Sequence, residues 1–107
     1  YITGGKFMLF KKKPSFDAYV EQGKVDPNIV FIDVREKEEY LQGHVNKSIN
    51  IPLSNIQNIK IEKSKSLYVY CLSGARSKMA CMYLKQMGYH DITNIGGIAK
   101  SKKGYLQ

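Results

Sequence analysis

Apolar residues along the chain fall into short continuous runs separated by polar or amphipathic stretches. Residues 29–32 and 67–70 are the clearest runs, and both are rich in β-branched or aromatic side chains. A continuous run of this length predicts a strand that is buried on both faces, as in a parallel sheet. Residues 48–51, closed by Pro52, and residues 92–95 predict two further strands.

The stretches between these runs favour helices. Ser15 is a suitable N-cap for a first helix, which we expect to end at Gly23. Residues 36–42 predict a short charged helix, and residues 53–61 carry apolar side chains at roughly helical spacing. The first helix is expected to turn three apolar side chains inward: Phe16, Tyr19 and Val20.

Residues 75–87 form the longest helical pattern, and Gly88 suits the left-handed position that often follows a helix. Gly96-Gly97 predicts a turn after the last strand. Strands that alternate with helices imply parallel pairing, with ligands bound beyond the carboxyl ends of the strands. We therefore expect an α/β fold with a small central parallel sheet flanked by helices on both faces. The long helix would bury one face: Met79, Ala80, Tyr83, Leu84 and Met87.

The chain's 107 residues suit a single domain. We interpret residues 1–14 as an N-terminal extension, which can include tag-derived residues, and residues 15–107 as that domain. Cys71 and Cys81 do not make a disulfide framework, and a lone pair of thiols fits a reducing compartment. No apolar run approaches the ~20 residues of a membrane span, and no secretory signal is visible. We therefore expect a cytoplasmic protein.

Positive charge dominates the chain, with 17 lysines and arginines against nine acidic residues and a net charge of +8. No zinc-finger, recognition-helix or aromatic RNA-binding pattern accompanies this charge. We interpret the lysines as solvated surface and expect neither a nucleic acid nor a membrane as partner. The charge should still attract anionic substrates by long-range steering. Neither cysteine has a partner at metal-ligand spacing, so no metal is expected. No organic cofactor is implied either.

Cys71 is expected at the carboxyl end of the 67–70 strand, directly before a tight loop and a helix. N–H groups of such a loop and of a helix's first turn lack helical partners, so they can form an anion nest around a sulfur. The helix dipole and the cation of Arg76 add positive potential. A free cysteine titrates near ~8.5, and such surroundings lower its pKa to roughly 3.5–7.5. Cys71 is therefore the expected nucleophile.

The other residues of the loop also suit the binding of an anionic sulfur. Gly74 can take the positive φ that a loop wrapped around a sulfur requires. Small side chains at Ser73 and Ala75 let the backbone approach a bound anion, and Arg76 can either fork onto an oxyanion or hold the loop rigid. The pattern requires no histidine, which argues against hydrolysis by a cysteine–histidine pair. It favours attack on an electrophilic sulfur with an anionic leaving group.

These residues resemble the rhodanese family over residues 31–97, which is most of the domain. Residues 71–77 match the family's Cys-x-x-Gly-x-Arg loop. Each remaining match is weak alone, but together they occur in the family's order and at its separations. They are Ile32-Asp33-Val34-Arg35, Glu38-Glu39-Tyr40, Gly43-His44-Val45, Asn50-Ile51-Pro52 and Gly96-Gly97-Ile98.

The resemblance implies a rhodanese fold and a sulfurtransferase in which Cys71 carries the transferred sulfur as a persulfide. Thiosulfate, a persulfide or a polysulfide is the implied donor, and a thiol, a thiol-containing protein or cyanide is the implied acceptor. Asp33, Arg35 and Glu39 match positions that support the site structurally. The residues implied to bind the sulfur and the donor oxyanion are Leu72, Ser73, Gly74, Ala75, Arg76 and Ser77.

Two positions depart from the family pattern. Leu72 follows the cysteine where many thiosulfate-active members have a basic residue, which puts thiosulfate in doubt as the natural donor. Ser101 stands where the family often has a tryptophan, so the C-terminal packing must differ.

Two alternative functions stay open beside the sulfurtransferase. The chain can act as a sulfur-relay or regulatory module that works only with a protein partner. It can also be a phosphatase or arsenate reductase of the same fold, but those proteins place an arginine six positions after the cysteine, whereas Arg76 is five after Cys71. Finally, Cys81 is expected to be an ordinary buried residue, with a disulfide to Cys71 as the second interpretation.

Overall fold

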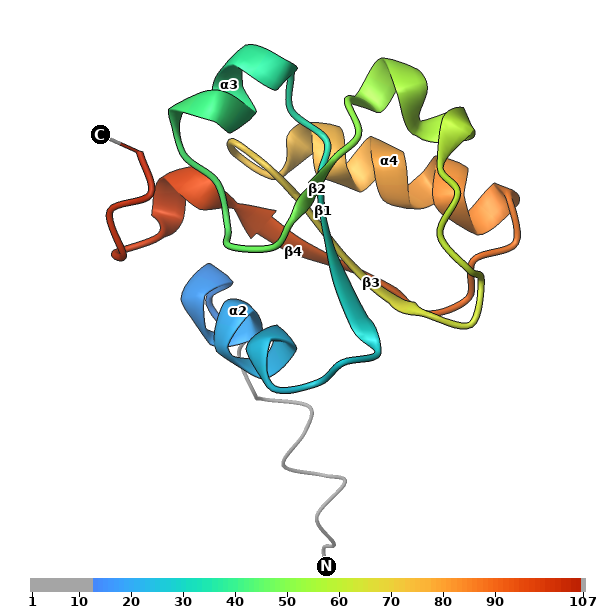
Figure 1. Ribbon diagram of the computed structural model, residues 1–107, viewed down its shortest axis with the longest axis horizontal. Coiled ribbons are helices and arrows are strands. Elements are labelled where there is room, and N and C mark those ends of the chain that lie inside the picture. Colours follow the sequence, from blue (N-terminus) through green and yellow to red (C-terminus); the bar gives the residue numbers. More distant parts are fainter. Residues whose placement is uncertain (1–12, 107) are drawn as a thin grey trace, which may run out of the picture.

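A computed structural model describes residues 13–106, which form a four-stranded parallel sheet with helices on both faces (Figure 1). The strand order is β2-β1-β3-β4. The predicted α/β fold is therefore confirmed. The predicted extension, residues 1–14, lies outside the described residues except for its last two. The elements are α2 (Phe16–Lys24), β1 (Ile29–Asp33), α3 (Lys37–Gln42), β2 (Ile49–Asn50), the 3₁₀ helix η1 (Leu53–Asn58), β3 (Ser66–Cys71), α4 (Ala75–Gln86), β4 (Ile92–Gly97) and the 3₁₀ helix η2 (Ile98–Lys100).

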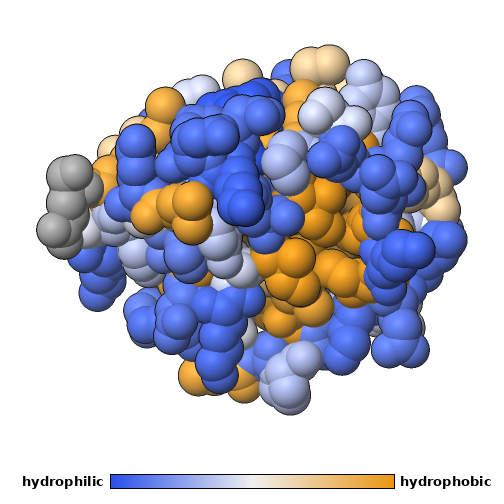
Figure 2. Space-filling model, turned by 45° about the horizontal axis from the view of Figure 1, so that its top comes forward, coloured by the Kyte–Doolittle hydropathy of each residue, from blue (hydrophilic) through white to orange (hydrophobic). Residues whose placement is uncertain are grey.

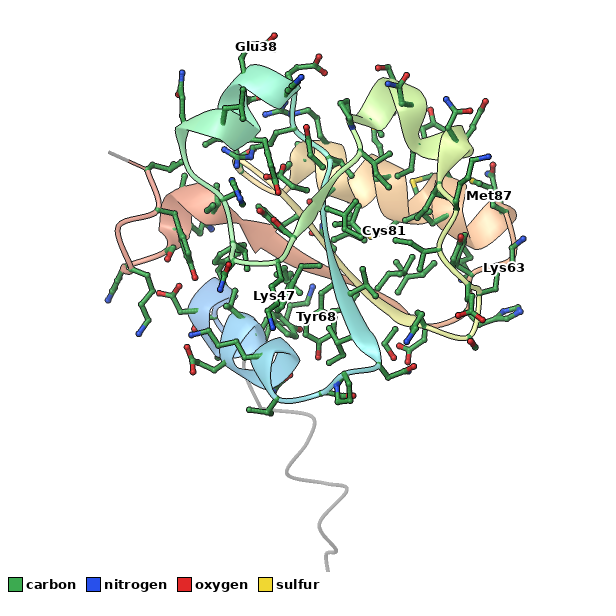
Figure 3. The ribbon with its side chains drawn as sticks, viewed as in Figure 1. Glu38, Lys47, Lys63, Tyr68, Cys81 and Met87 are labelled. Carbon is green, nitrogen blue, oxygen red and sulfur yellow. The ribbon has the colours of Figure 1, made fainter. Side chains whose placement is uncertain are left out.

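The sheet separates two apolar cores, because successive side chains of a strand point to opposite faces. On β3, Val69 and Cys71 face α4, whereas Tyr68 and Tyr70 face α2. Figure 3 shows Tyr68 on the α2 side of the sheet. The core on the α4 side contains Ile32, Val34, Ile56, Leu67, Val69, Cys71, Ala80, Leu84 and Tyr89; the core on the α2 side contains Phe16, Val20, Phe31, Val45, Tyr70, Ile95 and Ile98.

Helix α2 begins at its predicted cap, because the Ser15 hydroxyl accepts a hydrogen bond from the Ala18 N–H at 3.1 Å. The prediction that Gly23 ends this helix is wrong, since the helix continues to Lys24. Gly23 is buried inside it, where a Cβ would lie 2.2 Å from the ring of Phe31. Close contact between α2 and β1, rather than a turn, is what requires glycine here.

The predictions for three other segments also need correction. Residues 53–61 contain only the six-residue η1, whose first turn is closed by a hydrogen bond from the Asn55 N–H to the Pro52 carbonyl at 2.7 Å. The second strand is limited to two residues. Gly96-Gly97 continues β4 instead of forming a turn, because a bulge with Gly96 at φ +102° bends the strand without ending its pairing with β3.

The buried face of α4 also differs from the predicted one. It consists of Ser77, Ala80 and Leu84, whereas Met79 is 48% exposed and Tyr83 is 38% exposed. The apolar pattern does not identify the buried face of α4 correctly, because the helix carries apolar residues on its solvent side as well. Gly88 follows the helix at φ +102°, as predicted for the residue after a helix end.

Asp33 and Arg35 form an ion pair that is almost completely buried, with exposed fractions of 0% and 1%. The guanidinium donates to the carboxylate at 2.7 Å from Nη2 and at 3.0 Å from Nε, and Nη2 also donates to the Gly43 carbonyl at 2.7 Å. Burial by itself lowers the pKa of Arg35, but the hydrogen bonds and charge of Asp33 outweigh it and raise the pKa overall. The pair ties the end of β1 to the segment after α3.

The face shown in Figure 2 carries an apolar area surrounded by hydrophilic residues. Exposed apolar side chains include Met79 and Met82 on α4. Within residues 13–106, no helix has the length and apolar character needed to cross a bilayer. The same residues contain no cluster of three acidic, histidine or cysteine side chains arranged to hold a metal ion.

We predict that Arg35→Ala lowers the free energy of unfolding by about 3–5 kcal/mol, because it leaves the Asp33 carboxylate buried without its partner. Lys24→Ala is the matched control: it breaks an ion pair with Glu21 in which both side chains are more than half exposed, at a cost of about 1 kcal/mol or less. Denaturant unfolding followed by circular dichroism measures both losses. Equal losses for the two variants would contradict the prediction.

Candidate active site

The last residue of β3, Cys71, is followed by a tight loop and then directly by α4. Gly74 makes the join between loop and helix, with a left-handed φ of +106° that a residue with a side chain rarely adopts. The sulfur of Cys71 consequently lies at the N-terminus of a twelve-residue helix, where unpaired N–H groups and the helix dipole favour a negative charge. Residues 71–77 are thus brought together as the sequence predicts.

Hydrogen-bond donors surround the buried sulfur. The N–H of Gly74 donates to Cys71 Sγ at 3.0 Å, the N–H of Ser77 at 3.4 Å, and the Ser77 hydroxyl oxygen lies 3.5 Å away. Burial alone raises the pKa of this thiol, but the Ser77 hydroxyl and the N–H groups of Ser77, Gly74 and Ser73 outweigh it, so the pKa is lowered overall. The shift has the direction expected from the sequence, and it favours the nucleophilic thiolate.

Arg76 points to a carboxylate on α3 rather than standing free. Its guanidinium makes a two-pronged contact with Glu39, at 2.6 Å from Nη1 and 3.0 Å from Nη2. This hydrogen bonding lowers the pKa of Glu39 to about 2. Glu39 also accepts the N–H of Glu36 at 3.0 Å in the capping box of α3. Of the two roles considered for Arg76, this geometry favours holding the loop rigid.

Asp33 and Arg35 lie behind the loop, at the end of the neighbouring strand. Immediately after β1, the Val34 N–H donates to the carbonyl of Tyr70, the residue before Cys71, at 3.0 Å. Asn50 reinforces this corner by donating to the carbonyls of Asp33 at 3.0 Å and Arg35 at 2.9 Å. These residues therefore lie beneath the loop, and among the described residues no hydrogen bond joins Asp33 or Arg35 to the sulfur.

Asn94 on β4 is a member of the site that the sequence patterns did not identify. Its carbonyl oxygen accepts the Ser77 hydroxyl at 2.7 Å and the Gly96 N–H at 3.0 Å, while its amide donates to the Gly74 carbonyl at 3.2 Å. Asn94 thus holds Gly74 and Ser77, two of the residues that donate to the sulfur. A polar residue inside an apolar strand run, near the carboxyl end of the sheet, was the signal that could have found it.

The Ser77 hydroxyl has one proton and three neighbours that can accept it: Asn94 Oδ1, the Gly74 carbonyl and Cys71 Sγ. When Cys71 is a thiol, it can donate to the hydroxyl oxygen while the hydroxyl donates to Asn94. When Cys71 is a thiolate, the best use of the proton is to turn toward the sulfur. Asn94 therefore competes with the sulfur for this proton.

The loop lies directly on the backbone of β4, and Gly97 makes that contact possible. A Cβ at Gly97 would lie 2.3 Å from the carbonyl oxygen of Leu72 and 2.6 Å from the Cα of Ser73. The Ala99 N–H donates to the same Leu72 carbonyl at 3.1 Å. Close packing against the end of β4 therefore fixes the start of the loop, while the Leu72 side chain stays 37% exposed at its rim.

The second thiol, Cys81, occupies a different environment. It lies on the inner side of α4, toward the sheet (Figure 3), and packs against the core that contains Cys71. Burial raises its pKa to about 11. Both cysteines are free thiols, so no disulfide joins them. Cys81 is only partly buried, whereas the sequence predicts an ordinary buried residue.

Comparisons with known proteins give a family for this architecture. The family model for the rhodanese-like domain matches residues 15–103. Thiosulfate sulfurtransferase PspE from Escherichia coli (strain K12) is 39% identical over 72 residues, which cover 64% of this chain and 69% of that protein. A solved structure described as a rhodanese with anions from E. coli is 36% identical with a TM-score of 0.64, covering 69% of this chain and 92% of the other.

A further relative is longer than this chain. The putative sulfur carrier protein YrkF from Bacillus subtilis (strain 168) is 30% identical over 83 residues, which cover 76% of this chain. The match spans 45% of that relative's length.

We predict that iodoacetamide at pH 7 modifies Cys71 before Cys81, although Cys81 is the more exposed of the two. The reason is ionisation: with a pKa of about 11, Cys81 has on the order of one thiolate in ten thousand at this pH, whereas the Cys71 pKa is lowered. Peptide mass mapping after partial alkylation checks the order. Modification of Cys81 first would show that exposure outweighs ionisation.

We predict that Asn94→Asp raises the pKa of Cys71. The new carboxylate would hold the Ser77 hydroxyl more strongly and place a like charge one hydroxyl away from the thiolate, and both effects disfavour ionisation. The midpoint of the alkylation rate against pH would therefore move upward. Asn58→Asp, at an exposed position of η1, is the matched control with the same charge change. Equal midpoints in two folded variants would rule out a role for Asn94.

Proposed function

This chain belongs to the rhodanese-like domain family, and from that membership we propose that it is a sulfurtransferase in which Cys71 carries the transferred sulfur. The observation that carries the proposal is the buried sulfur of Cys71, which receives N–H groups at 3.0 and 3.4 Å and whose pKa is lowered. A relative named thiosulfate sulfurtransferase and another named putative sulfur carrier protein support the same class of chemistry.

In the loading step, the Cys71 thiolate attacks the outer sulfur of the donor. With thiosulfate, a new S–S bond forms to Cys71, the original S–S bond breaks, and sulfite leaves with the bonding electron pair. The product is a persulfide anion, Cys71–S–S⁻. The N–H groups of Gly74 and Ser77 and the N-terminus of α4 would stabilise the negative charge on the sulfur in both states.

In the unloading step, an acceptor thiol R–S–H attacks the outer sulfur of the persulfide. The S–S bond to Cys71 breaks and its electron pair stays on Cys71, which returns as a thiolate. The acceptor leaves as R–S–S–H, so no external oxidant or reductant is consumed. The thiolate that leaves is the form favoured by the loop, which assists this step as well.

The rest of the loop would serve the same reaction in supporting roles. Small residues at Ser73 and Ala75 leave room for the donor, and Arg76 keeps the loop in place through Glu39. The apolar side chain of Leu72 at the rim favours a persulfide or polysulfide donor over the dianion thiosulfate. The two free thiols suit a reducing compartment, so the proposal includes a cytoplasmic location.

One observation favours a second candidate, a sulfur-relay module that works only with a protein partner. Cys71 has no exposed surface, so a donor must enter the loop before it can react. A protein partner that opens the loop on docking would provide that access, and one relative is named as a putative sulfur carrier. In this case small donors alone would load the protein poorly.

We predict that incubation with thiosulfate or with a persulfide donor adds the mass of one sulfur atom to the protein, with more complete loading by the persulfide. Intact-mass spectrometry measures the gain. Cys81→Ser is the control that keeps the gain, and Cys71→Ser abolishes it. A gain that survives in Cys71→Ser would place the sulfur elsewhere. No gain from either donor would contradict the independent enzyme and favour the partner-dependent module.

A further inference from the structure

Three exposed apolar side chains lie on the solvent side of α4. They are Met79, Met82 and Tyr83, and Met82 is the most exposed of them at 58%. Residues three or four positions apart in a helix lie on one face, so these three form an apolar strip along α4. Exposed apolar area of this kind marks binding surfaces, and methionine suits them because its side chain adapts to the shape of a partner.

A hollow lies beside this strip, where α4 packs against the 3₁₀ helix η1 (Figure 1). Leu53, Ser54, Ile56 and Gln57 of η1 line it together with Tyr83 of α4. Its volume of about 240 Å³ is below the range of about 300–1,000 Å³ that is typical of small-molecule sites. The hollow therefore suits one apolar side chain of a docked protein better than a free ligand.

Positive charge borders the apolar strip. Lys78 and Lys85 lie four and three positions from Met82 on α4, and within residues 13–106 neither lysine takes part in an ion pair. Neither α4 nor η1 contains an acidic residue. The strip, the hollow and these two lysines together form one surface, the α4–η1 face. It complements a partner that has an apolar centre and an acidic border.

A protein bound to the α4–η1 face would extend to the reactive loop. α4 begins directly after the loop and has twelve residues, so it is about 18 Å long, and Met79 is about 6 Å along its axis from the first residue. A stable interface takes about 800 Å² from each partner, which is roughly 28 Å across. An interface centred on the strip would therefore reach Leu72 at the rim of the loop. The side chain of Cys71 also lies on the α4 side of the sheet.

We propose that the α4–η1 face is the docking surface for an acidic amphipathic helix of a protein that loads or unloads the sulfur of Cys71. The docked helix lies along the apolar strip, and one of its apolar side chains fills the hollow beside η1. Its carboxylates pair with Lys78 and Lys85. Docking needs this surface alone, whereas the purpose of docking rests on the proposed sulfur transfer.

The first test measures docking without sulfur chemistry. Cys71→Ser protein is titrated with a fluorescently labelled synthetic helix that has leucines on one face and glutamates on the other, and binding is followed by fluorescence anisotropy. A second peptide has lysine in place of each glutamate. We expect saturable binding of the glutamate peptide and roughly tenfold weaker binding of the lysine peptide, because lysines would repel the face. Equal binding of the two peptides would overturn the proposal.

A pair of charge variants tests the border of the face. Lys78→Glu combined with Lys85→Glu should weaken binding of the glutamate peptide roughly tenfold. The matched control combines Lys37→Glu with Lys102→Glu, which changes the net charge equally at exposed positions outside the face and should weaken binding far less. Equal weakening by both pairs would show attraction to the overall charge of the protein, and the proposal would fail.

A pair of apolar variants tests the strip. Met79→Ser combined with Met82→Ser removes apolar contact area without a change of charge, and we expect binding to weaken roughly tenfold. The matched control combines Val25→Ser with Leu41→Ser, whose side chains are 83% and 67% exposed on other parts of the surface. Unchanged binding by the Met79/Met82 variant would overturn the proposal. Circular dichroism checks that each variant is folded, as expected for substitutions at exposed positions.

NMR spectra of the Cys71→Ser protein locate the docked peptide. Backbone amide signals of η1, α4 and Leu72 should shift on binding, whereas those of α2, on the opposite side of the sheet, should not. Shifts confined to α2 would place the peptide elsewhere and overturn the proposal. If the peptide does not bind but phosphatidylglycerol vesicles do, through the same lysines and methionines, the face is a membrane surface and the proposed occupant is wrong.

These measurements separate failure of the inference from failure of the proposed function. If the peptide binds as expected while no donor loads Cys71, the docking surface stands and sulfur transfer is the part that fails. If Cys71 is loaded while the peptide does not bind to the α4–η1 face, the docking proposal fails and the sulfurtransferase stands.

Discussion

A sulfur atom without exposed surface can be ionised only if the protein supplies the hydrogen bonds that water would otherwise give it. The hydrogen bonds from the Gly74 and Ser77 N–H groups to Cys71 Sγ meet that requirement, and much of the fold serves to aim them. β3 ends at Cys71, Gly74 turns the chain through a left-handed conformation, and α4 begins at once. The sheet and the helix thus act as the two fixed ends of a very short loop.

The loop has to be held against three different neighbours for these hydrogen bonds to stay aligned. From α3, Glu39 holds the Arg76 guanidinium with two hydrogen bonds. From β4, Asn94 holds the Gly74 carbonyl and the Ser77 hydroxyl, next to the N–H groups that these two residues direct at the sulfur. Close packing over Gly97 fixes the start of the loop. The Ser77 hydroxyl can still rotate. This rotation allows it to donate to the sulfur when Cys71 changes from a thiol to a thiolate.

Features that depend on neighbouring residues could be read from the sequence, and features that depend on strand register could not. The apolar run at 67–70 predicts β3 and places Cys71 at its end, and Ser15 predicts the start of α2. In contrast, the fit of Gly23 against Phe31 and the contact of Asn94 with Ser77 arise between segments far apart in the chain. The sequence signal at Gly23 and Asn94 is weak. A small or polar residue at such a position becomes informative only when the segment that packs against it is known.

The geometry of the loop also bears on why sulfur transfer is a better interpretation than phosphoryl transfer. Phosphoryl transfer spreads negative charge over three equatorial oxygens, so its catalysts need several donors that face different points. In this loop the donors from Gly74 and Ser77 converge on one atom, and the guanidinium of Arg76, the best group for bridging two oxygens, is already engaged by Glu39. Freeing Arg76 would expose the Glu39 carboxylate to an approaching phosphate and repel it. Donors that converge on a single sulfur therefore do not assist phosphoryl transfer. The Glu39 carboxylate would in addition repel the phosphate.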